Sequence, residues 1–210
     1  MGILGVDEQL GFRVNETLGL IGKYVEHLGF KSEEDFLRIV GGKTILDAGS
    51  GQGGIAKQLA MRHSTARVIS LSSRLSQSDY RKDEKASTWI AGIQNQTTEL
   101  EEMESQKVHD SRAIAAFLQS IPLSNQSVDI ILDCMTSYYI DFKRITDFQR
   151  IIREYRRIIR ENGEVRLDIE EVRENHNLTW QENVFSRNGF DSERILKDGW
   201  ISGFKLKVKK

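Results

Sequence analysis

The sequence predicts an α/β fold in which a mostly parallel sheet carries helices on both faces. From residue 44 onward, short apolar segments typical of strands alternate with segments of helical periodicity. A glycine-rich turn joins the first strand to a helix, and two segments near the C-terminus lie close enough to form a hairpin. Such alternation builds βαβ units, and the hairpin adds an antiparallel edge.

Two amphipathic helices are expected before the first strand. The segment Asn15–Leu28 has apolar residues at spacings of three and four, and Gly29 is suited to end it. A second, shorter helix begins at Ser32, which forms a capping-box pattern with Asp35, and it stops at Gly41.

The expected strands are short apolar segments that alternate with the helices. Those of the parallel sheet are Thr44–Leu46, Ala66–Leu71, Val128–Leu132 and Glu164–Ile169. The segment Phe148–Glu161 has one continuous apolar stripe and is followed by Asn162-Gly163, which predicts a helix with a glycine stop. The predicted hairpin consists of Ser192–Leu196 and Ile201–Lys209, joined by Lys197–Trp200.

Length and composition indicate one globular domain. The chain has 210 residues, 39% of them hydrophobic, which suffices for one well-buried core. Within it we distinguish an N-terminal helical cap segment, residues 1–42, from the main domain, residues 43–210. The formal net charge of −1 excludes an overall basic field of the kind that attracts nucleic acid. Because Cys134 is the only cysteine and no apolar run reaches membrane-spanning length, we expect a cytoplasmic protein without an internal disulfide.

The most informative segment is the turn after the first strand. Gly49, Gly51 and Gly53 allow positive φ and let backbone amides approach a ligand at the positive end of the next helix. The spacing Gly49-x-Gly51-x-x-Gly54 also fits a dinucleotide site, so the glycines alone leave two ligand classes open. Asp47 favours one class, because a carboxylate suits a positively charged ligand end and would repel a pyrophosphate. S-adenosylmethionine carries an ammonium and a sulfonium but no phosphate.

Three segments together resemble the class I S-adenosylmethionine-dependent methyltransferases. Ile45–Gly53, with the sequence Ile-Leu-Asp-Ala-Gly-Ser-Gly-Gln-Gly, is similar to motif I of that family, in which an acidic residue precedes Gly-x-Gly-x-Gly. Ser127–Ile140, which follows Pro122-Leu123, resembles the fourth-strand segment, and Arg153–Leu167 resembles the helix, glycine turn and fifth strand. The resemblance implies a Rossmann-like, doubly wound sheet of seven strands with an antiparallel last strand, and S-adenosylmethionine as the methyl donor.

The resemblance also implies a set of cofactor-binding residues. They are Asp47, Gly49, Ser50, Gly51, Gln52, Gly53, Ser72, Asp110 and Asp133. Ser72 stands where the family usually has an acidic residue for the ribose hydroxyls, and loss of that charged acceptor would weaken binding by roughly 1–3 kcal/mol. Asp110 is the candidate for the adenine amino group, with a solvated turn residue as the alternative. Asp133 follows the fourth strand, where parallel sheets expose side chains to ligands, and a plain cap is its alternative.

The catalytic residues stay unassigned. Tyr138 and Tyr139 fall where the family often has aromatic or histidine residues near the methyl acceptor, with core packing as the alternative. Orientation of the methyl group in line with the leaving sulfur would supply most of the rate enhancement, so no general base is strictly required. The four histidines show no metal-ligand spacing, and we expect no metal site.

We therefore expect an S-adenosylmethionine-dependent methyltransferase that acts on a small-molecule acceptor. The sequence lacks an Asn/Asp-Pro-Pro-Tyr-like motif for nucleic-acid amines, while RNA and protein acceptors stay open. One alternative is a degenerate methyltransferase-like binding protein, which Ser72 motivates. The other is a nicotinamide-dependent oxidoreductase, supported by the spacing of Gly49, Gly51 and Gly54 alone.

Overall fold

The core of the fold is a single β-sheet. The computed structural model describes residues 20–50, 54–62, 64–72, 112–134, 145–173 and 178–210. Within these residues, seven strands form one sheet in the order β3-β2-β1-β4-β5-β7-β6. The strands are β1 Thr44–Ala48, β2 Arg67–Ser72, β3 Arg112–Ala115, β4 Val128–Asp133, β5 Ile159–Arg173, β6 Phe190–Lys197 and β7 Trp200–Val208. Neighbours from β3 to β5 pair in parallel, and β7 is antiparallel to β5 and β6. This arrangement confirms the predicted Rossmann-like fold with its antiparallel last strand.

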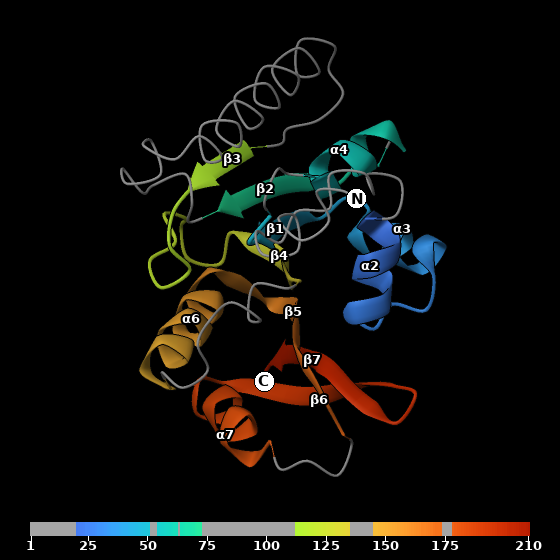
Figure 1. The fold of residues 1–210 in the computed structure, drawn as a ribbon. Helices are drawn as coiled ribbons and strands as arrows, with labels where there is room; N and C mark the ends of the chain where they lie inside the picture. The colour runs from blue at the N-terminus through green and yellow to red at the C-terminus, as the bar shows by residue number, and fades with distance from the viewer. Residues whose placement is uncertain (1–19, 51–53, 63, 73–111, 135–144, 174–177) are drawn as a thin grey trace, which may run out of the picture.

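Helices cover both faces of the sheet (Figure 1). On one face lie α2 Leu20–His27, α3 Glu33–Val40 and α4 Gly54–Met61. On the other lie α6 Ile145–Ile158 and α7 Thr179–Arg187. The predicted stripe of α6 explains its packing, because Phe148, Ile151, Ile152 and Tyr155 recur on one side of the helix and are all buried. α2 and α3 belong to the same core as the sheet, since Ile21 and Phe36 pack in one cluster with residues of β1.

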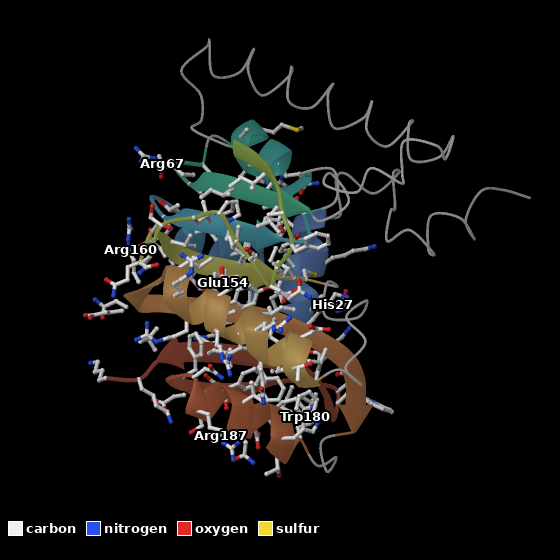
Figure 2. The ribbon with its side chains drawn as sticks, turned by 90° about the vertical axis from the view of Figure 1, so that its left-hand side faces the viewer. His27, Arg67, Glu154, Arg160, Trp180 and Arg187 are labelled. Atoms are coloured by element: carbon white, nitrogen blue, oxygen red, sulfur yellow. The ribbon has the colours of Figure 1, made fainter. Side chains whose placement is uncertain are left out.

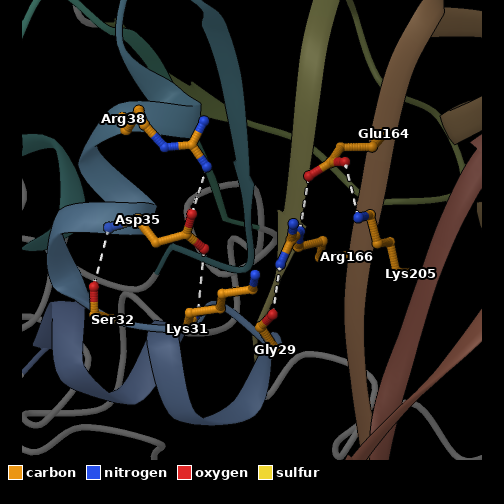
Figure 3. Close-up of polar contacts among 8 residues, drawn as sticks. All are labelled: Gly29, Lys31, Ser32, Asp35, Arg38, Glu164, Arg166 and Lys205. Atoms are coloured by element: carbon orange, nitrogen blue, oxygen red, sulfur yellow. Dashed lines mark hydrogen bonds and ion pairs between the residues drawn. The ribbon is translucent and has the colours of Figure 1, made fainter.

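The start of α3 follows the predicted cap with one difference (Figure 3). The Ser32 hydroxyl accepts a hydrogen bond from the Asp35 amide over 3.2 Å, as a capping box requires. The Asp35 carboxylate, however, accepts from the amide of Lys31 over 3.1 Å, one residue before the cap. It also pairs with Arg38 across one helical turn. The capping prediction is therefore confirmed at Ser32, with a different donor for the carboxylate.

The junction of α6 and β5 corrects the predicted helix end. The sequence predicts a helix to Glu161 and a stop at Gly163, but α6 ends at Ile158. The next residue, Ile159, already pairs with Val128 and begins β5. The strand takes over here because its partner β4 begins directly alongside, which periodicity alone cannot reveal.

Gly163 has a packing role inside β5. The pairing is irregular after Ile159 and resumes at Glu164, which faces Ile130. A Cβ atom at Gly163 would lie 2.7 Å from the carbonyl oxygen of Asp129 and 2.7 Å from Cγ1 of Ile159. Real Cβ atoms do not approach that closely, so glycine is needed here to let two strands meet.

A buried arginine joins the N-terminal helices to the sheet (Figure 3). The Arg166 side chain on β5 is 4% exposed and donates to the carbonyl oxygens of Leu28 and Gly29 over 2.9 and 3.0 Å. It also forms an ion pair with Glu164 over 2.8 Å and lies 3.8 Å from the ring centre of Phe30. The carbonyl groups at the end of α2 thus receive their donors from the middle of the sheet.

The predicted C-terminal hairpin forms, with a shorter connection than the expected Lys197–Trp200. Lys197 pairs with Trp200, so Asp198 and Gly199 form a two-residue turn. Both have positive φ, 50° and 79°, as a type I′ turn requires.

Two elements were not expected from the sequence: the short strand β3 and the helix α7. None of the helices in the described part of the chain has the length and apolar character needed to cross a membrane.

Candidate active site

The strand order identifies the part of the sheet where a ligand is expected. Order reverses between β1 and β4, because β2 and β3 extend to one side of β1 and β5 to the other side of β4. In open parallel sheets, ligands bind beyond the carboxyl ends of the strands at such a reversal. Asp47 is the last residue but one of β1, and Asp133 is the last residue of β4. Ala48 faces Asp133 in the register, so both carboxylates lie at this reversal.

The glycine turn leaves β1 in a fixed direction. Gly49 has φ of 76°, a conformation that glycine adopts without strain. The amides of Gly49 and Ser50 both donate to the carbonyl oxygen of Leu71, over 2.8 and 3.0 Å. The turn is therefore anchored to β2 at the same edge of the sheet. Helix α4 follows at Gly54, as the sequence predicts.

Asp47 is a fully buried carboxylate with one satisfied oxygen. Its Oδ1 atom accepts a hydrogen bond of 2.6 Å from the Tyr24 hydroxyl of α2. Its Oδ2 atom is buried without a hydrogen-bond partner among the described residues. Burial raises the pKa of Asp47 to about 7, and the charge of Asp133 acts in the same direction, while the hydrogen bond from Tyr24 acts to lower the pKa.

Asp133 forms a corresponding pair on the opposite face of the sheet. Alternate residues of a strand point to one face, and Asp133 alternates with Ile131, which packs in the core beneath α6. Its Oδ2 atom accepts a hydrogen bond of 2.8 Å from the Tyr155 hydroxyl of α6. Burial raises the pKa of Tyr155 well above its usual value, and the negative charge of Asp133 adds to the shift. This tyrosine therefore remains a hydroxyl donor.

A third buried carboxylate, Asp168, lies on β5 close to the same edge. The neighbouring Leu167 pairs with Asp133. The charge of Asp168 contributes to raising the pKa values of Tyr24 and of the buried Cys134 thiol, with burial as the larger cause in both. Three adjacent strands thus bring acidic side chains to one end of the sheet, which makes that end favourable for a cationic group and unfavourable for an anion.

The structure brings together part of the predicted site. Asp47, Gly49, Ser50 and Asp133 lie at the same edge, and Ser72 ends β2 there, opposite Ala115 of β3. The remaining candidates lie outside the described residues: Gly51, Gln52, Gly53, Asp110, Tyr138 and Tyr139. In the part of the chain that the structure describes, no group of three His, Cys, Asp or Glu side chains is placed to bind a metal ion.

Sequence reasoning missed both tyrosine partners and Asp168. Tyr24 lies three residues after Ile21 in α2 and Tyr155 lies in the apolar stripe of α6, so the helical periodicity placed both toward the core. A buried tyrosine hydroxyl needs a partner, which was the available signal. Asp168 continues the alternation of polar and apolar residues that begins at Glu164, so the sequence gives no signal that this carboxylate is buried.

Comparisons with known proteins agree with this architecture. Residues 46–167, more than half of the chain, match the family described as methyltransferase domain. No curated protein matches the sequence. An S-adenosylmethionine-dependent methyltransferase from Aquifex aeolicus is 14% identical with a TM-score of 0.56, over 94% of this chain and 100% of that one. A putative one from Methanococcus maripaludis is 15% identical with a TM-score of 0.55, over 91% and 84%.

The same fold also occurs in a protein named for a different reaction. The [4+2]-cyclase SpnF is 17% identical with a TM-score of 0.54, and the match covers 84% of this chain and 58% of SpnF. Likeness at this level of identity concerns the fold alone, and the reaction must be argued from the site. The family match and the sheet topology together show that this chain belongs to the methyltransferase domain family, with the fold of the class I S-adenosylmethionine-dependent methyltransferases.

Proposed function

We propose that the protein binds S-adenosylmethionine at the carboxyl edge of β1 and β4 and transfers its methyl group to a small-molecule acceptor. The observation that carries the proposal is Asp47, a buried carboxylate beside the glycine turn at the reversal of strand order. Its Oδ2 atom is buried without a hydrogen bond among the described residues. A buried oxygen without a donor costs about 1–3 kcal/mol, more when it is charged, and a ligand that supplies the donor recovers that free energy.

The residues fit the ammonium end of S-adenosylmethionine better than a dinucleotide. A positively charged donor would satisfy Asp47 Oδ2 and reduce the repulsion between Asp47 and Asp133. A pyrophosphate at this position would add negative charge to an edge that already holds three buried carboxylates. The acidic edge therefore supports the methyltransferase over the nicotinamide-dependent oxidoreductase.

Each described residue has a proposed role in positioning. Asp47 would hold the ammonium, and the bonds of Gly49 and Ser50 to Leu71 would hold the turn against which the ligand lies. Ser72, at the end of β2, would accept or donate one hydrogen bond at the ribose hydroxyls. Bound S-adenosylmethionine supplies a methyl group activated by the sulfonium. The protein's contribution is orientation, which can account for several kcal/mol of the barrier.

The charge distribution also bears on the acceptor. The chain has a formal net charge of −1, and Asp47, Asp133 and Asp168 are all buried at the candidate edge. A polyanion would meet repulsion there, because nucleic-acid binding depends on neutralising phosphates with Lys and Arg. We therefore favour a small acceptor that is neutral or positively charged over RNA. A protein side chain with the same chemistry is a further candidate.

Calorimetric titration tests this proposal. We expect the wild-type protein to bind S-adenosylmethionine and S-adenosylhomocysteine and not NAD, and Asp47→Ala to abolish the binding. Asp129→Asn is the matched control, since this carboxylate lies at the opposite edge of the sheet, where it accepts from the Thr44 amide and pairs with Arg160. In Figure 2 the labelled Arg160 and Arg67, the first residue of β2, mark that edge. Binding of NAD alone would support the oxidoreductase, and equal binding by Asp47→Ala would refute the assigned site.

The degenerate, non-catalytic protein remains the second candidate because of Ser72. A carboxylate at this position accepts two hydroxyl groups with charge assistance, and serine offers one neutral oxygen. Methyl-transfer assays with a panel of small amines, thiols and phenols separate the two. We expect turnover with at least one acceptor class; tight cofactor binding with no turnover across the panel would favour the binding protein.

A further inference from the structure

We infer that Tyr24 is a positioning residue of the cofactor site, whose hydroxyl orients the Asp47 carboxylate and directs its second oxygen to the ligand. The inference rests on the proposed function, and it adds a residue of α2 that lies outside the glycine motif. The geometry is direct: the Tyr24 hydroxyl donates to Asp47 Oδ1 over 2.6 Å, and Oδ2 is left for another donor. A tyrosine hydroxyl can donate one hydrogen bond, and Tyr24 donates it to Asp47.

Tyr24 is held in place from both ends of α2. Near the start of the helix, the Ile21 amide donates to Oε1 of Gln58 on α4 over 3.2 Å. At the other end, Arg166 of β5 donates to the carbonyl oxygen of Leu28. The ring of Tyr24 is itself buried, 6% exposed. Contacts to α4 and to β5 therefore fix the hydroxyl relative to the glycine turn.

Burial and the neighbouring negative charge disfavour the ionised form of Asp47, whereas the hydrogen bond from Tyr24 favours it. The described titratable groups around the Tyr24–Asp47 pair are Asp133 and Cys134 at the end of β4, Asp168 on β5 and Lys23 on α2, and of these Asp133 is the one whose charge shifts the pKa of Asp47. The buried polar residue of α4 is Gln58, which carries no charge. Arg166 on β5 is already paired with the Glu164 carboxylate. Burial and Asp133 raise the pKa of Asp47, and the Tyr24 hydrogen bond lowers it. Removing the hydroxyl should therefore leave more of the carboxyl protonated at neutral pH.

The carboxylate form is the one that binds an ammonium well, so affinity should depend on pH. Because the pKa of Asp47 is raised to about 7, affinity should rise with pH through that region, up to the alkaline pH at which the ligand's own ammonium begins to lose its proton. In Tyr24→Phe the pKa of Asp47 moves higher, and the midpoint of the affinity profile moves with it. A role of Tyr24 in packing alone would change stability but would not move this midpoint.

The test is calorimetric titration with S-adenosylhomocysteine between pH 5.5 and 8, where the ligand's ammonium stays largely protonated. For Tyr24→Phe we expect affinity about 10- to 100-fold weaker at pH 7, as loss of a hydrogen bond to a charged group implies, with partial recovery at pH 8. Tyr155→Phe is the matched control, since it removes the corresponding hydroxyl from Asp133 on the opposite face; its midpoint should not rise. Thermal unfolding of each variant reports on the fold.

A second measurement uses the wild-type protein alone. Titration at pH 6.5 in two buffers of different ionisation enthalpy counts the protons released on binding. We expect release of about three-quarters of a proton at most, since a carboxyl with a pKa of about 7 is only partly protonated at pH 6.5 and must ionise to bind the ammonium. A wild-type protein that binds without proton release and with a flat pH profile would overturn the inference, as would a Tyr24→Phe variant with unchanged affinity and midpoint. If the wild-type protein binds no adenosyl ligand, the proposed function fails first, and the inference fails with it.

Discussion

The Tyr155 hydroxyl of α6 donates to Asp133 over 2.8 Å, on the opposite face of the sheet from the bond between Tyr24 and Asp47. Two helices thus each supply one tyrosine to one carboxylate at the reversal of strand order. Tyr155→Phe keeps the ring but removes the hydroxyl that donates to Asp133. Because the Asp133 carboxylate is buried, loss of this donor should lower the free energy of unfolding by about 1–3 kcal/mol. Urea denaturation at pH 7 measures the change; an unfolding midpoint identical to wild type would contradict this reading.

Asp47→Asn should stabilise the protein at high pH. The pKa of Asp47 is raised from 3.8 to about 7 in the folded state, so its contribution to stability is present below about pH 4 and is lost as the pH rises to 7. Asparagine carries no charge at any pH and can still accept from Tyr24. At about 1.4 kcal/mol per pKa unit, the gain at pH 8 is at most about 4 kcal/mol. Denaturation at pH 5 and pH 8 checks the sign: the advantage of the variant should grow with pH.

Gly163→Ala should destabilise the protein strongly. The new Cβ would lie 2.7 Å from the Asp129 carbonyl oxygen, and relief requires movement of two paired strands, which we expect to cost about 2 kcal/mol or more. Gly22→Ala is the matched control. Gly22 lies inside α2, where the nearest atom to a new Cβ is Glu33 Oε1 at 3.9 Å, so this substitution should stabilise by about 0.5–1 kcal/mol. Opposite signs in chemical denaturation are the expected result.

Arg166→Met should cost about 3–5 kcal/mol of stability. The substitution keeps much of the side-chain volume but leaves the Leu28 and Gly29 carbonyl oxygens without their donor. It also removes the shorter of the two ion pairs of Glu164, whose carboxylate keeps only Lys205 at 3.7 Å. Arg38→Met removes an ion pair on the surface of α3, where the arginine side chain is 74% exposed, and should cost under about 1 kcal/mol. Equal losses for the two variants would show that Arg166 contributes no more than a surface pair.

The sequence predicted those features whose signals are local. The positive φ of Gly49 after β1 and the cap at Ser32 each depend on neighbouring residues, and both form as expected. The predicted hairpin also forms, but its turn comprises only Asp198 and Gly199 and not the four residues Lys197–Trp200. Strand β3 was missed because Arg112–Ala115 has only four residues and lacks the alternation of a half-buried strand.

Features that depend on distant neighbours could not be predicted. The helix stop expected at Gly163 was wrong, because glycine is required there by the close approach of the adjacent strand β4 and not by the end of the preceding helix. In the candidate site, Asp47 was predicted from the glycines that follow it, whereas its bond to Tyr24 joins residues 23 positions apart. The position of Asp133 followed from the end of its strand, but its tyrosine partner follows from the packing of α6.

The contact between Arg166 and Leu28 also constrains the order in which the chain can fold. It joins residues 138 positions apart, and α2 completes its contacts only when β5 is in place. Contacts of such long range form late, because closing the intervening chain costs entropy before the contact forms. During synthesis the carbonyl groups at the end of α2 therefore lack their Arg166 donor until the fifth strand has emerged, whereas the apolar side chains of α2 and α3 pack with residues that precede it.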